Sequence, residues 1–338
     1  MSNQNDVSID TINASGGGFS GMGAVASALL GSKFNVNSLR TNDVLRKNEW
    51  ELFDQTVVQV ARQRLVGVGD LLSRGLRLPV ANALGITRVE WEKVSDMGPA
   101  EINMSGLTEG QGDRVTYALE GTPLPIIHKD FKINIRALEA SRNMGQSLDT
   151  TQASLAARLV SERTETMLFD GYASIQMQGS TVRGYKTAPN RNTGSISNWA
   201  LVGTTGETIV AEVLAMILAL QGDNYNGPYG LYVPIDYYNK LLGDFKANSD
   251  KSILTRLLEM PDLEFIKISR NLPGGAAGQV IMVQLTADVV DMIDGMQPTT
   301  LQWESNGGMV VNFKVMAIMA PRMKSDAASQ SGIAHYSV

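Results

Sequence analysis

The sequence predicts an α+β fold in which a long two-stranded arm precedes a long helix. Three features support this prediction: a strand-rich excursion over residues 86–135, an amphipathic helix over 149–171, and a block of short helices and strands over 207–296. An isolated two-stranded ribbon is only marginally stable in water. The arm therefore needs a surface to lie on, and we infer that the chain assembles with copies of itself.

The composition is that of a globular protein, and it excludes several kinds of site. The 338 residues are 43% hydrophobic and 19% charged, which provides ample core for one large domain or two smaller ones. The chain has no cysteine, so disulfides, thiolate metal sites and a thiol nucleophile are excluded. The net charge of -5 argues against a protein whose main role is nucleic-acid binding, because such proteins are usually basic. A single basic face is still compatible with this net charge. No apolar run reaches the roughly 18 residues of a membrane span, so no membrane partner is expected.

Residues 1–41 are expected to form an N-terminal arm. They are rich in glycine, serine and alanine, and they lack the basic start and apolar core of a signal peptide. A disordered tail is one interpretation of this composition. The other is that the large apolar residues dock the arm on a neighbouring copy: Phe19, Met22, Leu29, Leu30 and Phe34.

A helical region is expected over residues 42–85. Asn42 or Asp43 can cap its first helix, and apolar residues then follow helical spacing as far as Ala61. Residues 40–88 hold eight Lys and Arg against five Asp and Glu, which makes this window locally basic. One interpretation is a solvated helix face, and the other is a lining that contacts packaged nucleic acid through its phosphates. The candidate DNA-facing residues are Arg62, Arg64, Arg74 and Arg77.

The projecting arm is expected over residues 86–135. Its outgoing strand carries the β-formers Ile86, Val89, Trp91 and Val94, and residues 115–135 return. A turn-rich tip joins the two halves and is the candidate contact with another subunit. The tip residues are Gly106, Leu107, Thr108, Glu109, Gly110, Gln111 and Gly112.

A long helix is expected to follow the arm. Asp149 is a good N-cap, Gln152 completes a capping-box-like pair, and Gly171 ends the helix. At about 1.5 Å per residue the helix is roughly 33 Å long. One face is a stripe of mostly small residues that permits close packing on a sheet: Ala153, Ala156, Ala157, Val160, Thr164, Met167 and Leu168.

The remaining chain predicts a loop-rich segment over 174–206, an α/β block and a returning hairpin. Thr204 or Thr205 can cap the helix that opens the block. The sequence Asn306-Gly307-Gly308 between two apolar strands predicts the hairpin. The elements expected in the block are helices over 207–220, 235–245 and 252–259 and strands over 231–234, 263–269 and 278–285.

No catalytic residue, cofactor or metal site is predicted. His128 and His335 stand in no metal-ligand spacing, and we expect a structural or exposed role for His128. A Walker-type glycine loop, a dinucleotide fingerprint and a nucleophile elbow are all missing from the sequence. Asp288, Asp291 and Asp294 recur every three residues, and we expect a solvated face there. The chain is therefore not expected to be an enzyme; a soluble enzyme with an unrecognised site is the alternative from another class.

The order of these elements resembles the Hong Kong 97-like capsid fold of tailed phages and encapsulins. The segment PLPIIHKDFKINIRALEASRNMGQSLDTTQASLAARLVSERTETMLFDGY is similar to the strand-to-spine segment of encapsulin-type shell proteins, and GPYGLYVPIDYYNKL resembles the opening of their axial domain. The resemblance covers about residues 45–320. It implies six parts: an N-arm over 1–41, a helical region over 42–85, an E-loop over 86–135, a P-domain with the spine helix over 136–206, an A-domain over 207–296, and P-domain return strands with the C-terminus over 297–338.

The resemblance implies a structural function. The main expectation is a major capsid protein that self-assembles through pentamers and hexamers into the icosahedral shell of a tailed phage, because the N-terminal arm is longer than an encapsulin shell needs. Double-stranded DNA held by non-specific contacts, a portal protein, and scaffold or decoration proteins are the implied partners. The protein would lie in the virion after assembly in the host cytoplasm. The A-domain loops near 222–228, 243–251 and 271–279 are expected to gather around the capsomer axis. The alternative is an encapsulin nanocompartment that encloses a cargo enzyme.

Some relatives with this fold staple their shells covalently through an E-loop lysine. Here no lysine lies between Lys93 and Lys129, so the tip of the arm has none to supply. We predict a non-covalent shell, and intact particles boiled in denaturing detergent should therefore run as a single monomer band. A ladder of high-mass bands in that gel would contradict the prediction.

Overall fold

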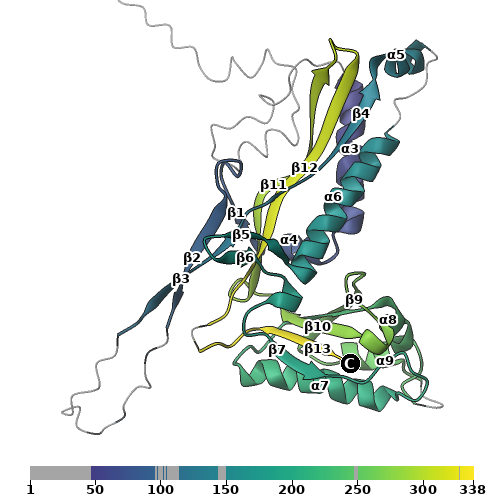
Figure 1. The fold of residues 1–338 in the computed structure, drawn as a ribbon. Coiled ribbons are helices and arrows are strands. Elements are labelled where there is room, and N and C mark those ends of the chain that lie inside the picture. The colour runs from purple at the N-terminus through teal and green to yellow at the C-terminus, as the bar shows by residue number, and fades with distance from the viewer. Residues whose placement is uncertain are drawn as a thin grey trace, which may run out of the picture.

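The computed structural model describes residues 47–95, 97, 102, 104, 114–143, 150–246, 250–326 and 328–338. Two sheets and a projecting two-stranded ribbon organise this part of the chain (Figure 1). A four-stranded sheet carries long helices on one face, and a five-stranded sheet carries helices of its own. The predicted α+β class is confirmed.

The four-stranded sheet is built on the predicted hairpin. The sheet order is β1 (Arg77–Pro79), β11 (Val290–Ser305), β12 (Val310–Met323) and β4 (Ile126–Asn134). Strands β11 and β12 run antiparallel. In the turn, Asn306, Gly307 and Gly308 have φ angles of 53°, 65° and 86°. This left-handed backbone suits glycine and asparagine, which explains the Asn-Gly-Gly sequence.

The spine helix α6 (Thr151–Asp170) lies on one face of this sheet. All seven residues of the predicted small-residue stripe are buried. Ala156 and Ala157 pack against Val315 and Ala317 of β12, and α3 (Lys47–Arg64) joins the same cluster. Gly171 ends the helix at a φ of 74°, as predicted. The helix begins at Thr151, so the N-cap position belongs to Thr150 and not to Asp149 as predicted; Asp149 itself lies outside the described residues.

The five-stranded sheet has its helices on one face. Val213, Leu231 and Leu257 belong to the core between them. Thr205 caps α7 as predicted, since its Oγ1 accepts a hydrogen bond of 3.3 Å from the amide of Thr208. The strand order is β7 (Asn192–Ser195), β13 (Ile333–Ser337), β10 (Gln279–Gln284), β8 (Tyr229–Val233) and β9 (Leu263–Ile268), and the helices are α7 (Gly206–Gly222), α8 (Ile235–Leu241) and α9 (Ile253–Leu258).

Two strands of the second sheet depart from the expected division of the chain. Strand β13 pairs with β10 and with β7. The expected grouping of residues 297–338 with the first sheet is therefore wrong for β13, and β7 lies in a segment predicted to be loop. Helix α4 (Gly67–Ser73) falls in the helical region expected over 42–85, whereas α5 (Ile135–Asn143) and the hairpin of β5 (Tyr172–Met177) and β6 (Ser180–Val182) were not predicted.

The ribbon is shorter than the predicted arm. Strand β2 (Arg88–Val94) pairs with β3 (Tyr117–Pro123) along its whole length. Strand β4 then leaves the ribbon and pairs with β12 instead. Residues 126–134 thus belong to the four-stranded sheet, although they were predicted within the arm at 86–135. An alternating strand pattern fits a ribbon and a sheet edge equally well, so the sequence does not separate the two.

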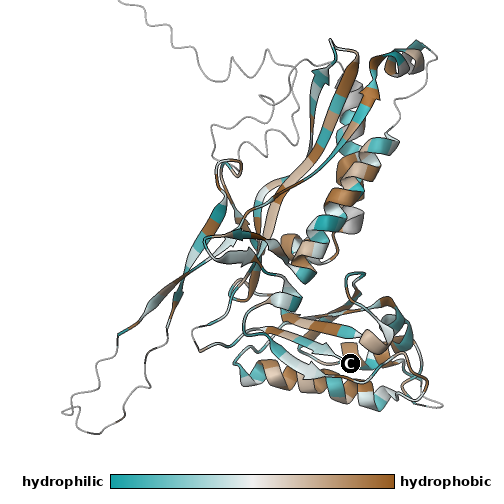
Figure 2. Cartoon of the chain, viewed as in Figure 1, coloured by the Kyte–Doolittle hydropathy of each residue, from teal (hydrophilic) through white to brown (hydrophobic). Residues whose placement is uncertain are grey.

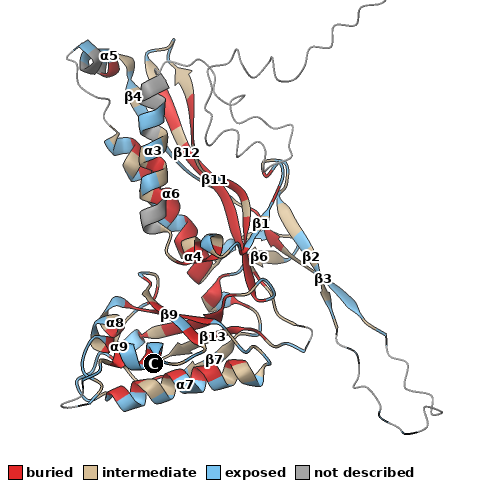
Figure 3. Cartoon of the chain, turned by 180° about the vertical axis from the view of Figure 1, so that it is seen from behind, coloured by how far each residue is buried: buried red, intermediate tan, exposed pale blue. Residues whose placement is uncertain are grey.

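Burial follows this architecture. Apolar residues gather where the sheets meet their helices, and the same regions are buried (Figures 2 and 3). The residues of the ribbon are exposed or half-buried, except for Thr122 and Pro123 at the end of β3. None of the described helices is both long and apolar enough to cross a membrane.

The short helix α4 joins the spine helix to the second sheet. From α6, Glu165 accepts hydrogen bonds from the amides of Gly67 at 2.6 Å and Val68 at 3.2 Å. From α4, Asp70 accepts a 2.9 Å hydrogen bond from the Tyr232 hydroxyl of β8 and pairs with Lys267 of β9. We call this set of contacts the α4 joint.

Burial governs the ionisation of Glu165. It raises the pKa of the carboxyl from 4.5 to about 7, and the nearby charge of Asp70 adds to the rise. The two backbone hydrogen bonds lower the pKa but do not outweigh burial. Between these two pH values the folded chain binds more protons than the unfolded chain at this position. The contribution of Glu165 to stability is therefore present below about pH 4.5 and is lost as pH rises towards 7.

We predict that Glu165→Gln removes this pH dependence. Glutamine keeps an acceptor for the α4 amides and carries no charge. The stability of the wild type relative to the variant should fall by up to about 3 kcal/mol between pH 4.5 and 8, measured as unfolding midpoints at constant salt. Glu162→Gln, at an exposed position on the same helix, is the control and should follow the wild-type profile. Parallel profiles for wild type and Glu165→Gln would contradict the prediction.

Candidate assembly interface

The ribbon has two different faces because side chains alternate along its paired strands. One face turns to the body of the chain. There Arg322 of β12 lies over the Trp91 ring, 5.6 Å from its centroid, and the Lys93 ammonium donates to the Ser325 hydroxyl at 3.1 Å. Arg322 is itself held by Asp291, from Nε at 2.8 Å. These contacts fix the base of the ribbon on the first sheet.

The opposite face of the ribbon carries exposed apolar side chains towards its far end. Val94 pairs directly with Tyr117, and Leu119 follows two residues on along the same face. Their side chains are 49%, 67% and 61% exposed. Glu92 pairs directly with Leu119 and shares this face, and Glu90 lies nearer the base. We call Val94, Tyr117 and Leu119 the free ribbon face, since no part of the described chain covers it.

Exposed apolar residues continue beyond the paired strands. Ile102 and Met104 are fully exposed, and Met97 is 61% exposed. Large apolar side chains exposed in this number near one end of a projecting ribbon are typical of a protein–protein contact. The predicted tip at Gly106–Gly112 lies outside the described residues, so its contact role stays a prediction.

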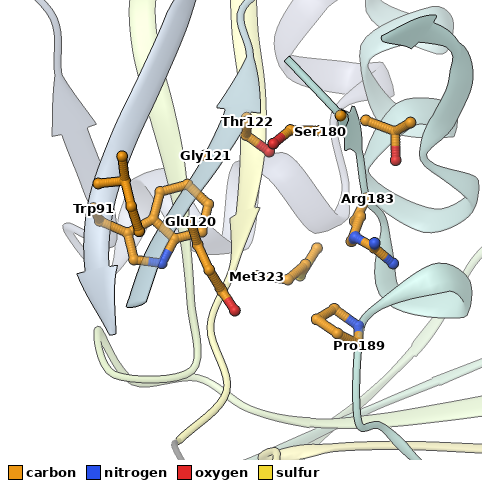
Figure 4. Close-up of a pocket in the computed structure, with 11 residues that line it drawn as sticks. Trp91, Glu120, Gly121, Thr122, Ser180, Arg183, Pro189 and Met323 are labelled. Carbon is orange, nitrogen blue, oxygen red and sulfur yellow. The ribbon is translucent and has the colours of Figure 1, made fainter. Parts of the chain in front are cut away.

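A small cleft marks the place where the ribbon meets the β5–β6 hairpin. Trp91 and Glu120 of the ribbon face Arg183, Pro189 and Met323 across it (Figure 4). Its volume is about 180 Å³, below the range of roughly 300–1,000 Å³ that small-molecule sites occupy. The cleft therefore belongs to the anchorage of the arm rather than to a substrate site.

The described candidate basic residues are engaged within the chain. Arg74 pairs with Glu264 of β9 at 2.6 Å and lies over the Phe265 ring. Arg77 lies 3.9 Å from Asp294, in an ion pair whose carboxylate is largely covered. Arg62 and Arg64 fall on α3, but their side chains are outside the description. The basic lining therefore remains a prediction, and Arg74 has an evident structural role in the α4 joint.

The other polar residues form no reactive constellation in the described part of the chain. His128 is exposed, as expected, and lies 3.4 Å from Asp130. Burial, together with Arg191 and Lys186, lowers the pKa of His335 to about 4. The described residues contain no group of three His, Asp or Glu side chains arranged to hold a metal ion.

Asp291 corrects the expectation of a solvated acidic face. It lies on strand β11 rather than a helix, it is buried, and it pairs with Arg322 and with Lys324 at 2.9 Å. Positions three apart on a strand lie on opposite faces. The three-residue spacing therefore does not place Asp291 and Asp294 on one shared face.

The three predicted A-domain loops do not gather at one end of the second sheet. The loop at 243–251 adjoins the first turn of α7, where Lys246 pairs with Glu207. The loop at 222–228 follows the other end of this 17-residue helix, about 25 Å away. The loop at 271–279 reaches the spine, where the Thr166 hydroxyl lies 3.3 Å from the Asn271 side chain. Their position relative to a capsomer axis stays a prediction.

Comparison with known proteins agrees with this architecture. Residues 37–336 match the model of DUF6260, a family of unknown function. The type 1 encapsulin shell protein EncA of Myxococcus xanthus (strain DK1622) is 28% identical over 197 residues, which cover 58% of this chain and 63% of EncA. A diheme-cytochrome-encapsulin shell fusion protein of Kuenenia stuttgartiensis is 25% identical over 62% of this chain and 51% of its own length. The chain thus matches less than two thirds of either curated relative.

Solved structures show the same fold at low sequence identity. The virus-like particle protein of Pyrococcus furiosus has a TM-score of 0.59 and 18% identity, covering 85% of this chain and 98% of its own. The capsid protein of Myoviridae phage XM1 has a TM-score of 0.58 and 12% identity, covering 75% and 86%. The chain therefore belongs to the DUF6260 family, and its fold is the Hong Kong 97-like fold that phage capsids and encapsulin-type shell proteins share.

Proposed function

We propose that this chain is a major capsid protein, which self-assembles through pentamers and hexamers into the icosahedral shell around the double-stranded DNA of a tailed phage. The observation that carries the assembly part is the free ribbon face. A ribbon that projects from its own body with uncovered apolar side chains gains stability only when another molecule covers it. In a shell, the surface that covers it belongs to an adjacent copy.

The energetics favour assembly over an isolated subunit. Burial of each large apolar side chain contributes about 1.5–3 kcal/mol, and the free ribbon face offers three of them. Part of this gain offsets the loss of translational and rotational freedom on association. Each subunit in a closed shell both gives and receives such a contact, so the gains recur throughout the particle. Stability then becomes a property of the assembly.

Several finer features belong to the phage proposal. The segment at 1–41 would serve as an N-terminal arm, and Arg62 and Arg64 of α3 would face packaged DNA through non-specific phosphate contacts. A portal protein and scaffold or decoration proteins would complete the virion, assembled in the host cytoplasm. The low-identity match to the phage XM1 capsid supports the shell architecture of this proposal and not its contents.

A second candidate is favoured by the curated relatives. Both are encapsulin shell proteins, so an encapsulin nanocompartment that encloses a cargo enzyme is the alternative. The shell would form through the same ribbon contact, and only its contents would differ.

The assembly proposal is tested on the free ribbon face. We predict that the double variant Tyr117→Lys/Leu119→Lys, like deletion of Gly106–Gly112, leaves soluble protein that forms no particles in electron micrographs. Charged side chains at the centre of a dry contact lose their hydration without a partner, which opposes association. Ala118→Lys places the same charge on the other face of the same strand and should still assemble. Normal particles from the double variant would contradict the proposal.

The contents of the shell separate the two candidates. We predict that particles purified from the natural source, after nuclease treatment, release long double-stranded DNA on denaturation. An ultraviolet spectrum dominated by absorbance at 260 nm and a genomic band on a gel would be the expected result. Particles that contain a second, folded protein and no protected DNA would support the encapsulin alternative instead.

A further inference from the structure

Strand β4 leaves one edge of the four-stranded sheet open. It stands last in the sheet order, and β12 is the one described strand that pairs with it. Within the described chain, β4 packs chiefly on β12, on α6 and on α5, which continues from its end. The backbone N–H and C=O groups along its outer side therefore have no strand to pair with. Such an edge is a template for a further strand.

The spine helix presents apolar side chains above this edge. Helix α3 packs against α6 on the side of β11, whereas α6 itself lies over β12 and β4. Ala157 is buried in one cluster with Val57 of α3. Leu155 and Leu159 each lie two positions from Ala157, about 200° around the helix, and thus on the flank away from α3. They are 44% and 42% exposed.

The two faces of β4 differ in polarity. On the face turned to α6, Phe131 and Ile133 are half-buried beside the helix. On the other face, His128, Asp130 and Lys132 are exposed. Side chains alternate between the faces of a strand with a period of two. A strand that adds to this edge must therefore be apolar at every second position and polar between.

A stretch of the N-terminal segment has this pattern. Phe34 and Val36 alternate with Asn35 and Asn37, and aromatic and β-branched residues suit strands. The spacing also fits the helix above the edge. Positions two apart on a strand are about 7 Å apart, and positions four apart on a helix, such as the two exposed leucines, are about 6 Å apart along its axis.

The segment enters the described chain at the matching end of the sheet. Strand β4 runs towards the β11–β12 turn, where Asn134 pairs with Val310. Helix α6 begins at that end too, because Ala153 shares a cluster with Val311. Helix α3 runs alongside α6 towards α4, so its first residue also lies near the turn (Figure 1).

The length of chain before α3 is sufficient to reach the edge. From Asn37 to Lys47, the first described residue, the chain can span up to about 33 Å. Helix α3 lies beside β11, and a strand added beyond β4 is three strand spacings away, which is about 14 Å. The remaining length lets the chain pass around the first turn of α6. The segment can therefore reach the edge of its own subunit.

We infer that residues 33–37 add to the outer side of β4 of the same subunit as a fifth strand, with Phe34 on Leu159 and Val36 on Leu155. The strand runs parallel to β4, which keeps its end near the start of α3. The inference goes beyond the proposed shell function, because it assigns a contact within one subunit and holds whatever a shell encloses. It also places Phe34 on its own chain rather than on a neighbouring copy.

The added strand fixes where the rest of the N-terminal segment starts. Residues 1–32 then leave the subunit at the Ile126 end of β4. The chain passes from the ribbon into the first sheet at that same end, since β3 ends at Pro123. The N-terminal segment and the ribbon therefore depart from one place on the subunit.

Engineered disulfides test the inference on the full chain, which has no cysteine of its own. Asn35→Cys is combined in turn with His128→Cys, Asp130→Cys and Lys132→Cys, which scans the register on the polar face. After oxidation at least one pair should lose both free thiols, because adjacent strands bring Cα atoms within the roughly 4–7 Å that a disulfide needs. The control is Asn35→Cys/Lys314→Cys. Lys314 pairs with Asp130 from β12, one strand further from the edge, so this variant should keep both thiols.

Each other outcome has a definite consequence. If none of the three pairs forms a disulfide, the inference is overturned. If the disulfide joins two chains in a denaturing gel, the segment of another copy occupies the edge, and the assignment to the same subunit is overturned. If the Lys314 control cross-links as fully as the best pair, the segment is merely tethered near the sheet, which overturns the inference as well.

A second variant tests the apolar anchors. Phe34→Asp/Val36→Asp, added to the pair that cross-links, should abolish the disulfide, whereas Asn37→Asp on the polar side should leave it intact. Equal cross-linking in both backgrounds would show that the two leucines of α6 do not hold the segment. Particle formation, which tests the proposed function, is a separate measurement, so the two proposals can fail independently.

Discussion

The buried carboxylate of Glu165 holds α4 on the spine helix, and through α4 the spine helix is linked to the second sheet. The first amides of a helix have no partner within it, and Glu165 supplies that partner to α4 from the spine. Helix α4 then presents Asp70 and Arg74 to β8 and β9. Because the spine helix also carries the first sheet, and the ribbon is anchored on that sheet, the direction of the arm relative to the second sheet follows from this chain of contacts.

Aromatic packing surrounds the α4 joint and makes it continuous with the core. The rings of Phe169 and Tyr232 lie 5.3 Å apart edge to face, and Tyr185 contacts both. One hydrophobic cluster therefore includes residues of the spine, of α4 and of both sheets. A joint built in this way does not behave as a loose linker. The subunit is expected to enter an assembly with its arm and its second sheet already oriented, which lowers the entropic cost of the contacts described above.

The elements that were predicted from the sequence are those whose signals are local. The stripe of α6, the glycine at its end, the cap of α7 at Thr205 and the Asn-Gly-Gly turn each depend on residues within a few positions of one another. The sheet positions of strands β4, β7 and β13 were not predicted correctly, because the strands they pair with are far away in the sequence. A strand pattern does not indicate which sheet the strand joins. Of the candidate site, the existence of the arm was predictable from its length and position, but its inner and outer faces were not. The role of Glu165 was not predictable from the sequence. A glutamate beside a small-residue stripe has the pattern of a solvated helix residue, and Glu165 is buried only because α4 folds over it.

The position of β13 has a consequence for the order of synthesis. This strand lies between β7 and β10, so β7 touches the rest of the second sheet only through residues 333–337. While a ribosome is still producing the chain, β7 has been made long before the strand that holds it. The second sheet therefore stays open at one side until translation has passed β13, and α7, which packs on β13, has no finished surface to lie on before then. The arm, the spine helix and the first sheet are therefore all synthesised before the second sheet can be completed.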